Sequence, residues 1–452
     1  MRPKSALVFV QILLFTALAA SKNHCEDDLM VLKKNSFAYS KWQRPMERRL
    51  MKVYLFNYTN WERVRDGLDT KFDIEEVGPY VYSQQLERVN VTWEGDLLTY
   101  QEHSNFTFLP EASAGAHSDK VFVPNVPLLD VSSNVANSNY FTQVAMRLLL
   151  SMVANDTETF LQLTVERFLW GYEDELVKTI KPFLDIKGYN FTNFGLLVTK
   201  NGTSSNILTI NTGENDINKI NTIEKLNGHK ALSFWDNPEC NSIESSDGSA
   251  FPPLSLDKNQ TLKVFSSGLC RRLPFKYAKD VEMGDGVKLL RYELARDVFD
   301  DPAHNPDNQC YCNIDTGDCP PRGVFNVTHC STSRFLTEGP AVASFPHFHL
   351  GDPALRERFT GLHPDSEQHQ SYLDIHPTLG IAVRGKSTLQ LNIQVKKLEN
   401  FGPVQYFPQG LILPVAWIEM SVEELPENLQ TLENLNKLLT EKMSWPFSIV
   451  AH

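Results

Sequence analysis

Cysteine is the residue type whose spacing in this 452-residue chain points most clearly to chemistry. One cysteine, Cys25, stands alone near the N-terminus, and the other six form a block: Cys240, Cys270, Cys310, Cys312, Cys319 and Cys330. Clustered cysteines build either a disulfide framework or a zinc site. The block lacks the paired two-residue intervals of zinc ribbons and fingers, so the spacing favours an oxidised framework. The spacing alone does not determine which cysteines are paired.

The second residue type that points to chemistry is the asparagine of Asn-x-Ser/Thr sequons, because it accepts N-linked glycans in the secretory pathway. A single sequon arises often by chance, and its alternative is an unmodified asparagine. Eight spread over one chain favour a secreted or cell-surface glycoprotein: Asn57, Asn90, Asn105, Asn155, Asn190, Asn201, Asn259 and Asn326.

The first twenty residues agree with that compartment. Basic residues precede an apolar run from Ala6 to Ala20, and Ala17-Leu18-Ala19 supplies small residues for signal peptidase. The sequence therefore predicts a signal peptide at 1–20. The alternative is a short N-terminal anchor, although a helix from 6 to 20 would span only about 22 Å of a hydrocarbon core of roughly 30 Å. The stretch 444–452 is too short to span, so we expect no C-terminal membrane helix.

Two further patterns suggest catalysis or metal binding. Residues Gly380–Ser387 match the phosphate-loop pattern, but an alternating strand begins where that motif requires a helix, so a hairpin turn is the better interpretation. His347 and His349, with His363, His369 or His376, could supply a metal site, yet hydrogen-bonded structural histidines are the simpler interpretation. We expect no catalytic residue, no metal, no cofactor and no enzyme activity.

Composition limits the partners of the chain. It is 42% hydrophobic and 11% aromatic, which is enough to bury a large core. The net charge of -12 and the pI near 5.5 argue against a nucleic-acid ligand, which requires a basic surface. An acidic surface suits an extracellular protein.

Short apolar runs bounded by Gly, Pro and Asn predict a mainly β protein, with strands at 52–57, 77–82 and 120–123. The clearest strand runs from Ser387 to Val395, where Leu389, Leu391, Ile393 and Val395 alternate with polar residues. Helical spacing appears at Tyr140–Trp170, which we expect to be a helical hairpin, and at Val422–Met443. No repeat or linker interrupts 21–443, so one ectodomain is expected.

Several motifs, in order and with similar spacing, resemble class B scavenger receptors. They are Trp42, Phe56–Asn60, Glu76–Tyr82, Phe168–Tyr172, the cysteine block, Phe345–Phe348 and Tyr372–Ile375. The resemblance runs from about residue 29 to about residue 439. That family includes fatty acid translocase, a lysosomal integral membrane protein and insect sensory neuron membrane proteins.

The resemblance implies an α+β fold: a large antiparallel β-barrel with an internal apolar tunnel, stapled by disulfides and capped by a helical bundle, here at about 139–180. It implies the bridges Cys240–Cys310, Cys270–Cys330 and Cys312–Cys319 inside the cysteine-rich part, 240–330. The two long bridges would each stabilise the fold by about 4 kcal/mol through unfolded-state entropy. Leu391, Ile393, Phe345 and Phe348 suit either the tunnel wall or the core.

The helical bundle is where family members capture ligands, which implies a candidate ligand-binding apex: Met146, Arg147, Leu150, Asp156, Glu158 and Phe160. Between residues 140 and 179, the sequence contains three basic and six acidic residues. Like charges repel an anionic particle, so neutral lipids, sterols, carotenoids or a protein partner are favoured over oxidised lipoprotein. The alternative is a solvated helix face without a ligand role.

The function that the resemblance implies is a plasma-membrane receptor facing the extracellular side, which binds lipids (fatty acids, sterols, carotenoids or phospholipids) or lipoprotein and passes lipid through a tunnel. One alternative is a trafficking or adhesion receptor that holds protein cargo at the apex. Another is a soluble, secreted lipid-binding decoy, because family members normally carry a second membrane helix where this chain has only 444–452.

Overall fold

The computed structural model describes most of the chain between residues 30 and 423. The described ranges are 30–136, 140–141, 143–144, 158–174, 178–179, 193–235, 237–252, 258–283, 286–312, 319–330, 341–398 and 401–423. The expected signal segment 1–20 and the tail 444–452 lie outside these residues.

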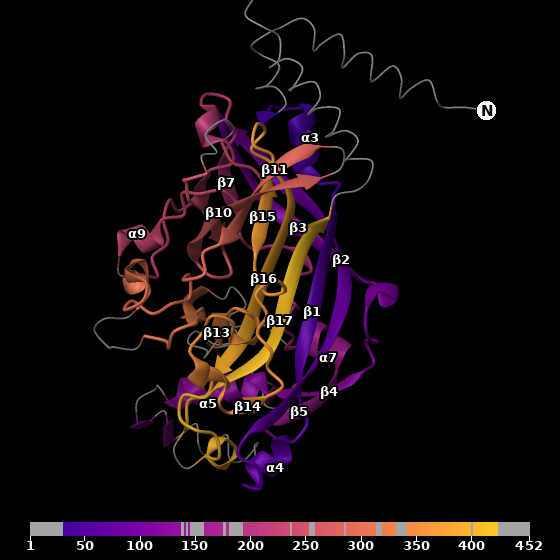
Figure 1. Ribbon diagram of the computed structural model, residues 1–452, viewed down its shortest axis with the longest axis vertical. Coiled ribbons are helices and arrows are strands. Elements are labelled where there is room, and N and C mark those ends of the chain that lie inside the picture. The colour runs from indigo at the N-terminus through magenta and orange to yellow at the C-terminus, as the bar shows by residue number, and fades with distance from the viewer. Residues whose placement is uncertain are drawn as a thin grey trace, which may run out of the picture.

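A single large sheet of fifteen strands dominates the fold, and its long strands run side by side along the molecule (Figure 1). Its neighbouring strands are, in order, β8 (Ile223–Leu226), β7 (Leu208–Asn211), β3 (Leu97–Phe108), β2 (Phe72–Glu94), β1 (Arg48–Tyr58), β17 (Ile412–Glu423), β16 (Ala382–Gln394), β15 (Tyr372–Ile375), β11 (Val287–Leu294), β10 (Arg271–Met283) and β9 (Leu262–Ser266). All these neighbours pair antiparallel.

Four short strands attach to this path: β6 (Gly202–Thr203), β12 (Val324–Asn326), β13 (Ala341–Ser344) and β14 (Phe359–Thr360). Only β14 pairs in parallel, with β2, among the described strands. A separate two-stranded sheet joins β4 (Lys120–Pro124) to β5 (Phe160–Thr164). The expected strands at 52–57, 77–82, 120–123 and 387–395 therefore lie in β1, β2, β4 and β16 and are confirmed, the last of them up to Gln394.

The large sheet has two edges, β8 and β9, and its ladder is open between them. One short segment reaches both edges: the Ile223 amide donates to the Ser245 carbonyl and the Phe265 amide donates to the Ser246 carbonyl, each at 2.9 Å. Buried charge anchors this segment, because Asp247 pairs with Arg88 of β2 at 3.2 Å. Sheet order and hydrogen bonds thus bring the two edges to the same two residues.

Helices are short. The α-helices within the described residues are α3 (Phe37–Gln43), α4 (Trp61–Arg65), α5 (Val126–Ala136), α7 (Val165–Trp170) and α9 (Pro238–Asn241). The 3-10 helices are η1 (Pro110–Ala112), η3 (Ile217–Lys219), η4 (Pro306–Tyr311), η5 (Thr328–Cys330), η6 (Pro346–Phe348), η7 (Pro353–Arg356) and η8 (Gly402–Val404). Side-chain caps start several of them, as where Ser36 accepts the Tyr39 amide. Within the described chain, none of the helices has both the length and the apolar character needed to cross a bilayer.

The expected helical hairpin at Tyr140–Trp170 is wrong in its second half. Residues 140, 141, 143 and 144 are helical, but Phe160–Thr164 form β5 and only Val165–Trp170 return to helix. Phe160 and Leu163 are three residues apart, so they would share one face of a helix but point to opposite faces of a strand; pairing with β4 gives the strand. The expected helix at 422–443 begins inside β17, and its remainder lies outside the described residues.

Two large apolar clusters fill the sheet and its connections. The first gathers residues of β1, β2, β4, β5, α5 and β17. In it the rings of Tyr58, Phe72 and Phe407 pack at tilted angles against that of Phe160. The second gathers residues of β9, β10 and β11 with Phe299, Phe325 and Phe345. Strand β16 contributes side chains to both clusters and its neighbour β17 to the first, and these two strands carry the candidate site.

Candidate functional site

One face of β16 and β17 is apolar and only half-buried. Leu389 and Leu391 of β16 lie opposite Ile418 and Ala416 of β17, so these side chains share a face. Leu389, Leu391 and Ile418 keep intermediate exposure in mid-sheet, as does Met420. The same row continues onto β1, where Val53 pairs with Ile418 and is fully buried. We call Leu389, Leu391, Ile418 and Met420 the apolar wall.

The apolar wall lies between the two large clusters. Leu389 packs against the second cluster, whereas Ile418 and Met420 pack against the first, although Leu389 and Ile418 are cross-strand neighbours. Half-exposed aliphatic side chains in the middle of a long sheet forgo burial that would be worth about 25 cal/mol per Å². Such a surface can bind an apolar ligand without displacing packed side chains.

The opposite face of the same strands is polar and fully buried. Thr388, Gln390 and Asn392 alternate with the apolar wall and are at most 2% exposed. They lie under residues 345–371, which we call the strap; it crosses over β16 and β17 and contains η6, η7 and β14 (Figure 1). The polar face therefore has hydrogen-bond partners in place of solvent.

Each buried polar residue of β16 has its partner near the start or the end of the strap. The side-chain oxygen Oε1 of Gln390 accepts the backbone amide of His347 at 2.6 Å, and Nε2 of Gln390 donates to Asn392 Oδ1 at 2.7 Å. Thr388 Oγ1 donates to the His369 carbonyl at 2.6 Å, and the Thr388 amide donates to Ser371 Oγ at 2.9 Å. Unmade bonds of this kind would cost about 1–3 kcal/mol each.

The imidazole rings of two strap residues stack on each other. The rings of His347 and His369 are 4.9 Å apart with an interplanar angle of 5°, and both residues are buried. Glu76 Oε2 of β2 lies 2.5 Å from His347 Nε2 and accepts the Trp417 indole N–H at 2.6 Å. His349 lies beside this stack, with its ring centroid 6.4 Å from that of His369. We call Glu76, His347, His369 and His349 the histidine cluster.

Backbone amides of the strap define the protonation of both stacked rings. His347 Nδ1 accepts the His363 amide, and His369 Nδ1 accepts the Asp365 amide, each at 3.0 Å. A nitrogen that accepts an N–H carries no proton, so the His347 proton lies on Nε2, where it is donated to Glu76. In this arrangement the Nδ1 atoms of both rings act as hydrogen-bond acceptors.

The environment of the cluster shifts its acid–base equilibria. Burial, with the nearby His347, lowers the pKa of His369 to about 4. Burial also lowers the pKa of His349. Burial acts to raise the pKa of Glu76, but hydrogen bonds from His347 and Trp417 and the nearby imidazoles outweigh it and lower that pKa.

The strap begins with a strained backbone. His347, Phe348 and Leu350 have φ of 53°, 53° and 62°, in the left-handed region that costs a residue other than glycine about 1–3 kcal/mol. Gly361 closes the same segment onto β2, where a Cβ would lie 1.9 Å from the Ile74 carbonyl oxygen. Contacts with the sheet therefore hold the strap in a conformation that it would not adopt alone.

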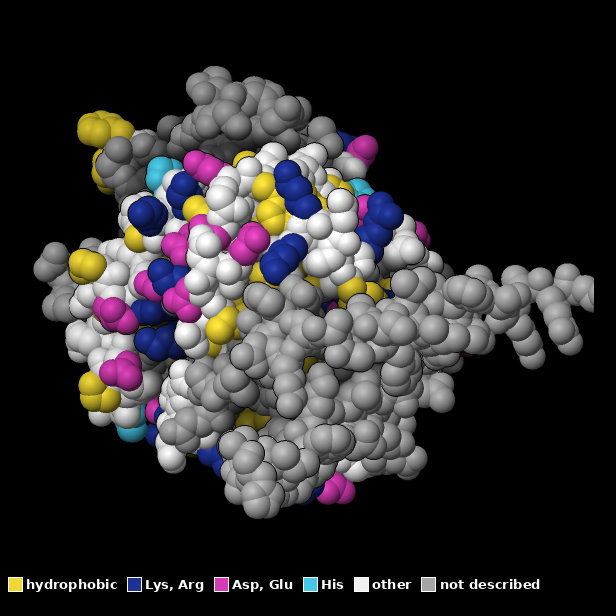
Figure 2. Space-filling view, turned by 90° about the horizontal axis from the view of Figure 1, so that it is seen from above, with side chains coloured by type: hydrophobic (Ala, Val, Ile, Leu, Met, Phe, Trp, Pro, Cys, Tyr) yellow, Lys and Arg dark blue, Asp and Glu magenta, His cyan; other side chains and the backbone are white. Residues whose placement is uncertain are grey.

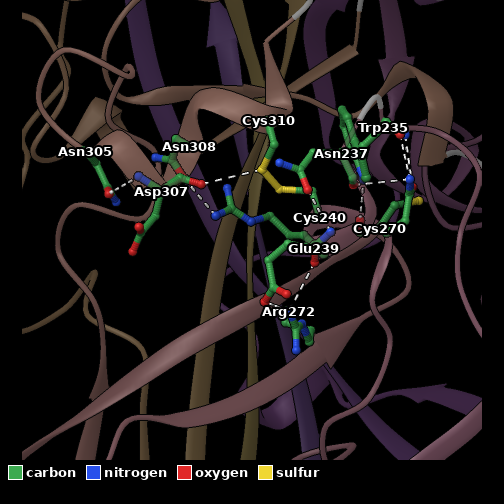
Figure 3. The surroundings of a disulfide bond; sticks show 12 residues. Trp235, Asn237, Glu239, Cys240, Cys270, Arg272, Asn305, Asp307, Asn308 and Cys310 are labelled. Carbon is green, nitrogen blue, oxygen red and sulfur yellow. Dashed lines mark hydrogen bonds and ion pairs between the residues drawn. A yellow bond between two sulfur atoms is a disulfide. The ribbon is translucent and has the colours of Figure 1, made fainter.

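The cysteine-rich part contains two disulfides, Cys240–Cys310 and Cys312–Cys319, with Cα separations of 6.2 and 4.9 Å. The first joins α9 to η4, close to the Arg272–Glu239 ion pair and to the Trp235 indole, which donates to the Cys270 carbonyl (Figure 3). Cys270 and Cys330 are buried thiols in this structure rather than a third bridge. They are neighbours, since a hydrogen bond with Cys270, reinforced by burial, raises the pKa of Cys330.

Comparison with known proteins identifies the family. The model of the CD36 family matches residues 5–450. The chain belongs to the CD36 family. It is 31% identical to human lysosome membrane protein 2 over 93% of this chain and 84% of that protein. It is 30% identical to bovine scavenger receptor class B member 1 over 88% of this chain and 75% of that protein. The family is thus one of class B scavenger receptors and related membrane proteins.

Most of the apex expected for this family lies outside the described residues, including Met146, Arg147, Leu150 and Asp156. Glu158 is exposed and pairs with Arg65 at 3.1 Å. Phe160 is 2% exposed and packs among Tyr58, Trp61 and Phe72, which is a core position in this structure.

The sequons fall into three groups. Asn90, Asn105, Asn201 and Asn259 are exposed. Asn57 and Asn326 are half-buried, and Asn57 uses both side-chain atoms inside the fold: Nδ2 donates to Glu75 and Oδ1 accepts the Phe122 amide. Asn155 and Asn190 lie outside the described residues.

The other sequence candidates have structural roles here. Lys386 and Ser387 lie within β16, and the connection from β15 precedes them, as the hairpin interpretation expects. Phe345, Phe348 and Ile393 are buried in core clusters, whereas Leu391 stays half-exposed in the apolar wall. Among the residues that the structure describes, no group of His, Cys, Asp and Glu has metal-binding geometry.

Sequence reasoning grouped His347, His349 and His369 only as candidate metal ligands, and it missed Glu76. In the structure His347 and His349 belong to a 3-10 turn, and the ring that stacks on His347 is that of His369. The available signal was the row of polar residues inside β16, since an alternating strand in a large core buries polar groups only where other groups bond them.

Proposed function

We propose that this chain is a receptor that binds lipids or lipoproteins and passes lipid along an enclosed apolar route through its ectodomain. Family membership supports the receptor role. The apolar wall is the observation that carries the route, because Leu389, Leu391, Ile418 and Met420 stay half-exposed between two cores. An acyl chain on such a surface avoids the cost of about 0.8 kcal/mol per CH₂ returned to water.

Closure of the sheet into a barrel is part of the proposal. The bonds from both sheet edges to Ser245 and Ser246 support it, because they bring β8 and β9 to one short segment. The apolar wall would then line the interior, and the strap would cover the outside. Neutral lipids, sterols and carotenoids suit a wall in which all four side chains are uncharged.

Substitution in the wall tests the route. Ile418→Trp adds bulk at its centre, and we expect transfer of a fluorescent sterol ester from vesicles to fall at least tenfold. Capture of the vesicles by the protein should persist, because the wall is not the capture surface. Leu68→Trp is the matched control, since Leu68 is 66% exposed and lies outside the wall. Unchanged transfer by folded Ile418→Trp protein would refute the route.

An extracellular-facing position is proposed on the exposed sequons. Asn90, Asn105, Asn201 and Asn259 should carry glycans in a protein made by secretory cells. Asn57 should not, because its amide is engaged with Glu75 and the Phe122 backbone. Glycopeptide mass spectrometry measures the occupancy of each sequon. If none of the four exposed sequons carried a glycan, this location would be refuted.

Capture of protein cargo at the apex is the second candidate. Tyr140 and Phe141 are adjacent helical residues that are 72% and 84% exposed. Exposed neighbouring aromatic residues are typical anchors of protein interfaces. The test is a double variant, Tyr140→Ser with Phe141→Ser. If it no longer binds a cargo protein but still transfers sterol, this function is favoured over the lipid route.

At the α3 end, acidic and basic side chains intermingle over the described surface (Figure 2). Such a mixed surface offers no single sign of charge to attract an ionic ligand there. The two candidate functions therefore rest on the wall and on the apex.

A further inference from the structure

The strap is held by hydrogen bonds that exist only while two histidines are neutral. The amides of His363 and Asp365 donate to Nδ1 of His347 and of His369. A proton added at either Nδ1 replaces the acceptor with a donor and faces the amide N–H directly. Protonation therefore cannot leave these contacts as they are.

The stacking of the rings adds a second opposition to acid. Protonated His347 and His369 would hold two positive charges face to face, with ring centroids 4.9 Å apart, in a buried site. One carboxylate, Glu76, contacts this pair and would compensate one charge. His369 gains a proton freely only when the strap lifts and water reaches its ring.

The outer part of the strap is exposed to solvent. Residues 363 and 365–368 are exposed, whereas His369 at their base is 1% exposed. Lys386 holds the same turn by donating to the carbonyls of Glu367 and Gln368 at 2.9 Å. The left-handed residues His347, Phe348 and Leu350 gain conformational freedom if their contacts break.

We infer that the strap is an acid-released latch, in which protonation of the histidine cluster frees residues 363–371 from the outer face of β16 and β17. The latch is closed at the neutral pH of the cell surface and opens in acidic endosomal or lysosomal compartments. It acts on the same two strands whose other face carries the apolar wall. Its test requires no lipid, so it stands apart from the proposed lipid route.

The charged groups around the cluster set the direction of the response. Glu76 and Asp365 favour protonation of His369, whereas His347 and His349 oppose it, and Arg296 and Arg356 oppose protonation of His349. Lys386 of β16 adds a further positive charge near the strap turn. Burial adds to the opposing charges and outweighs the two carboxylates, so acid favours the open strap.

The size of the response follows from linkage. With a pKa of about 4 for His369 under the closed strap and 6.5 in water, lowering the pH from 7.4 to 5.0 raises the open-to-closed ratio roughly 25-fold. Hydrogen–deuterium exchange of the full chain, corrected for intrinsic pH dependence, measures this ratio in peptides that cover residues 361–371. We expect those peptides to lose about that factor of protection, while β16 peptides keep theirs.

Two variants decide whether the cluster is responsible. His369→Asn keeps a side-chain oxygen for the Asp365 amide and cannot titrate, so its strap should stay protected at pH 5.0. His304→Asn is the matched control, because His304 is an exposed histidine paired with Asp301, and it should keep the full response. Glu76→Gln removes a carboxylate that favours protonation of His369 under the closed strap, so acid should open the strap more readily and the midpoint should move to higher pH.

Equal protection of the wild-type strap at pH 7.4 and 5.0 would overturn the inference. So would an undiminished acid response in His369→Asn protein. If His369→Asn does not fold, Glu76→Gln still decides, because an unchanged midpoint in that variant excludes the cluster as the sensor.

Discussion

The two faces of β16 and β17 reverse the usual relation between polarity and burial. The face that carries Thr388, Gln390 and Asn392 is polar and at most 2% exposed, whereas the face that carries Leu389 and Leu391 is apolar and half-exposed. The polar face is buried because the strap bonds it. Side chains of the apolar face stay half-exposed, since none of the segments that the structure describes packs fully over them. Polarity in this strand therefore marks an intramolecular interface, and apolarity marks a candidate ligand surface.

The largest effect is expected on the polar face. Gln390→Ala leaves the His347 amide and Asn392 Oδ1 without their partner in a buried site. Two unsatisfied groups should lower the free energy of unfolding by about 3 kcal/mol, measured by chemical denaturation at pH 7.4. Gln394→Ala, at the half-exposed end of the same strand, is the control and should change it by less than about 0.5 kcal/mol. Equal effects would mean that strap bonding does not distinguish the faces.

The second effect is a dependence of stability on pH. His369 has a pKa of about 4 in the folded protein and an ordinary pKa of 6.5, so above pH 6.5 it is neutral in both states and contributes no slope. Between pH 6.5 and 4 the unfolded chain binds the extra proton, and the free energy of unfolding falls as the pH falls, by about 3 kcal/mol in total. Below pH 4 the contribution of His369 becomes constant.

Glu76 acts in the same direction at lower pH. Its folded pKa is lowered, so its stabilising contribution is present above its ordinary pKa and is lost as the pH falls through the folded value. Thermal melts of wild-type and His369→Asn protein over this range provide the measurement. His369→Asn should flatten the slope between pH 6.5 and 4, and a slope that is the same in both proteins would contradict the assignment to His369.

Sequence alone predicted the strands better than their faces. The alternation from Ser387 to Gln394 is local, so it predicted β16 directly. Which face is buried depends on partners far along the chain: His347 is 43 residues from Gln390, and Glu76 is 271 residues from His347. Periodicity carries no information about such contacts. Phe160 was misassigned for the same reason, because only its pairing with Pro124 makes it a strand residue.

Cysteine pairing shows the same limit from another side. The cysteine block predicted a disulfide framework, and the resemblance to class B scavenger receptors supplied the pairs Cys240–Cys310 and Cys312–Cys319, which the structure contains. Spacing could not choose them, because it is silent on which loops meet in space. For Cys270 and Cys330, which meet as buried thiols here, oxidation to a third bridge stays a proposal, and counting free thiols in the purified protein tests it.

The smallest change in stability is expected on the apolar face, and it separates the two faces by function. Leu391→Gln replaces a half-exposed side chain, so it should cost less than about 1 kcal/mol, yet it places an amide in the lipid route and should reduce sterol-ester transfer severalfold. Thr388→Val on the other face removes the bond to the His369 carbonyl and should cost about 2 kcal/mol while transfer at pH 7.4 is unchanged. Denaturation and transfer assays on both proteins give the comparison. If Leu391→Gln unfolds the protein and Thr388→Val blocks transfer, the roles of the two faces are the reverse of those argued from their burial.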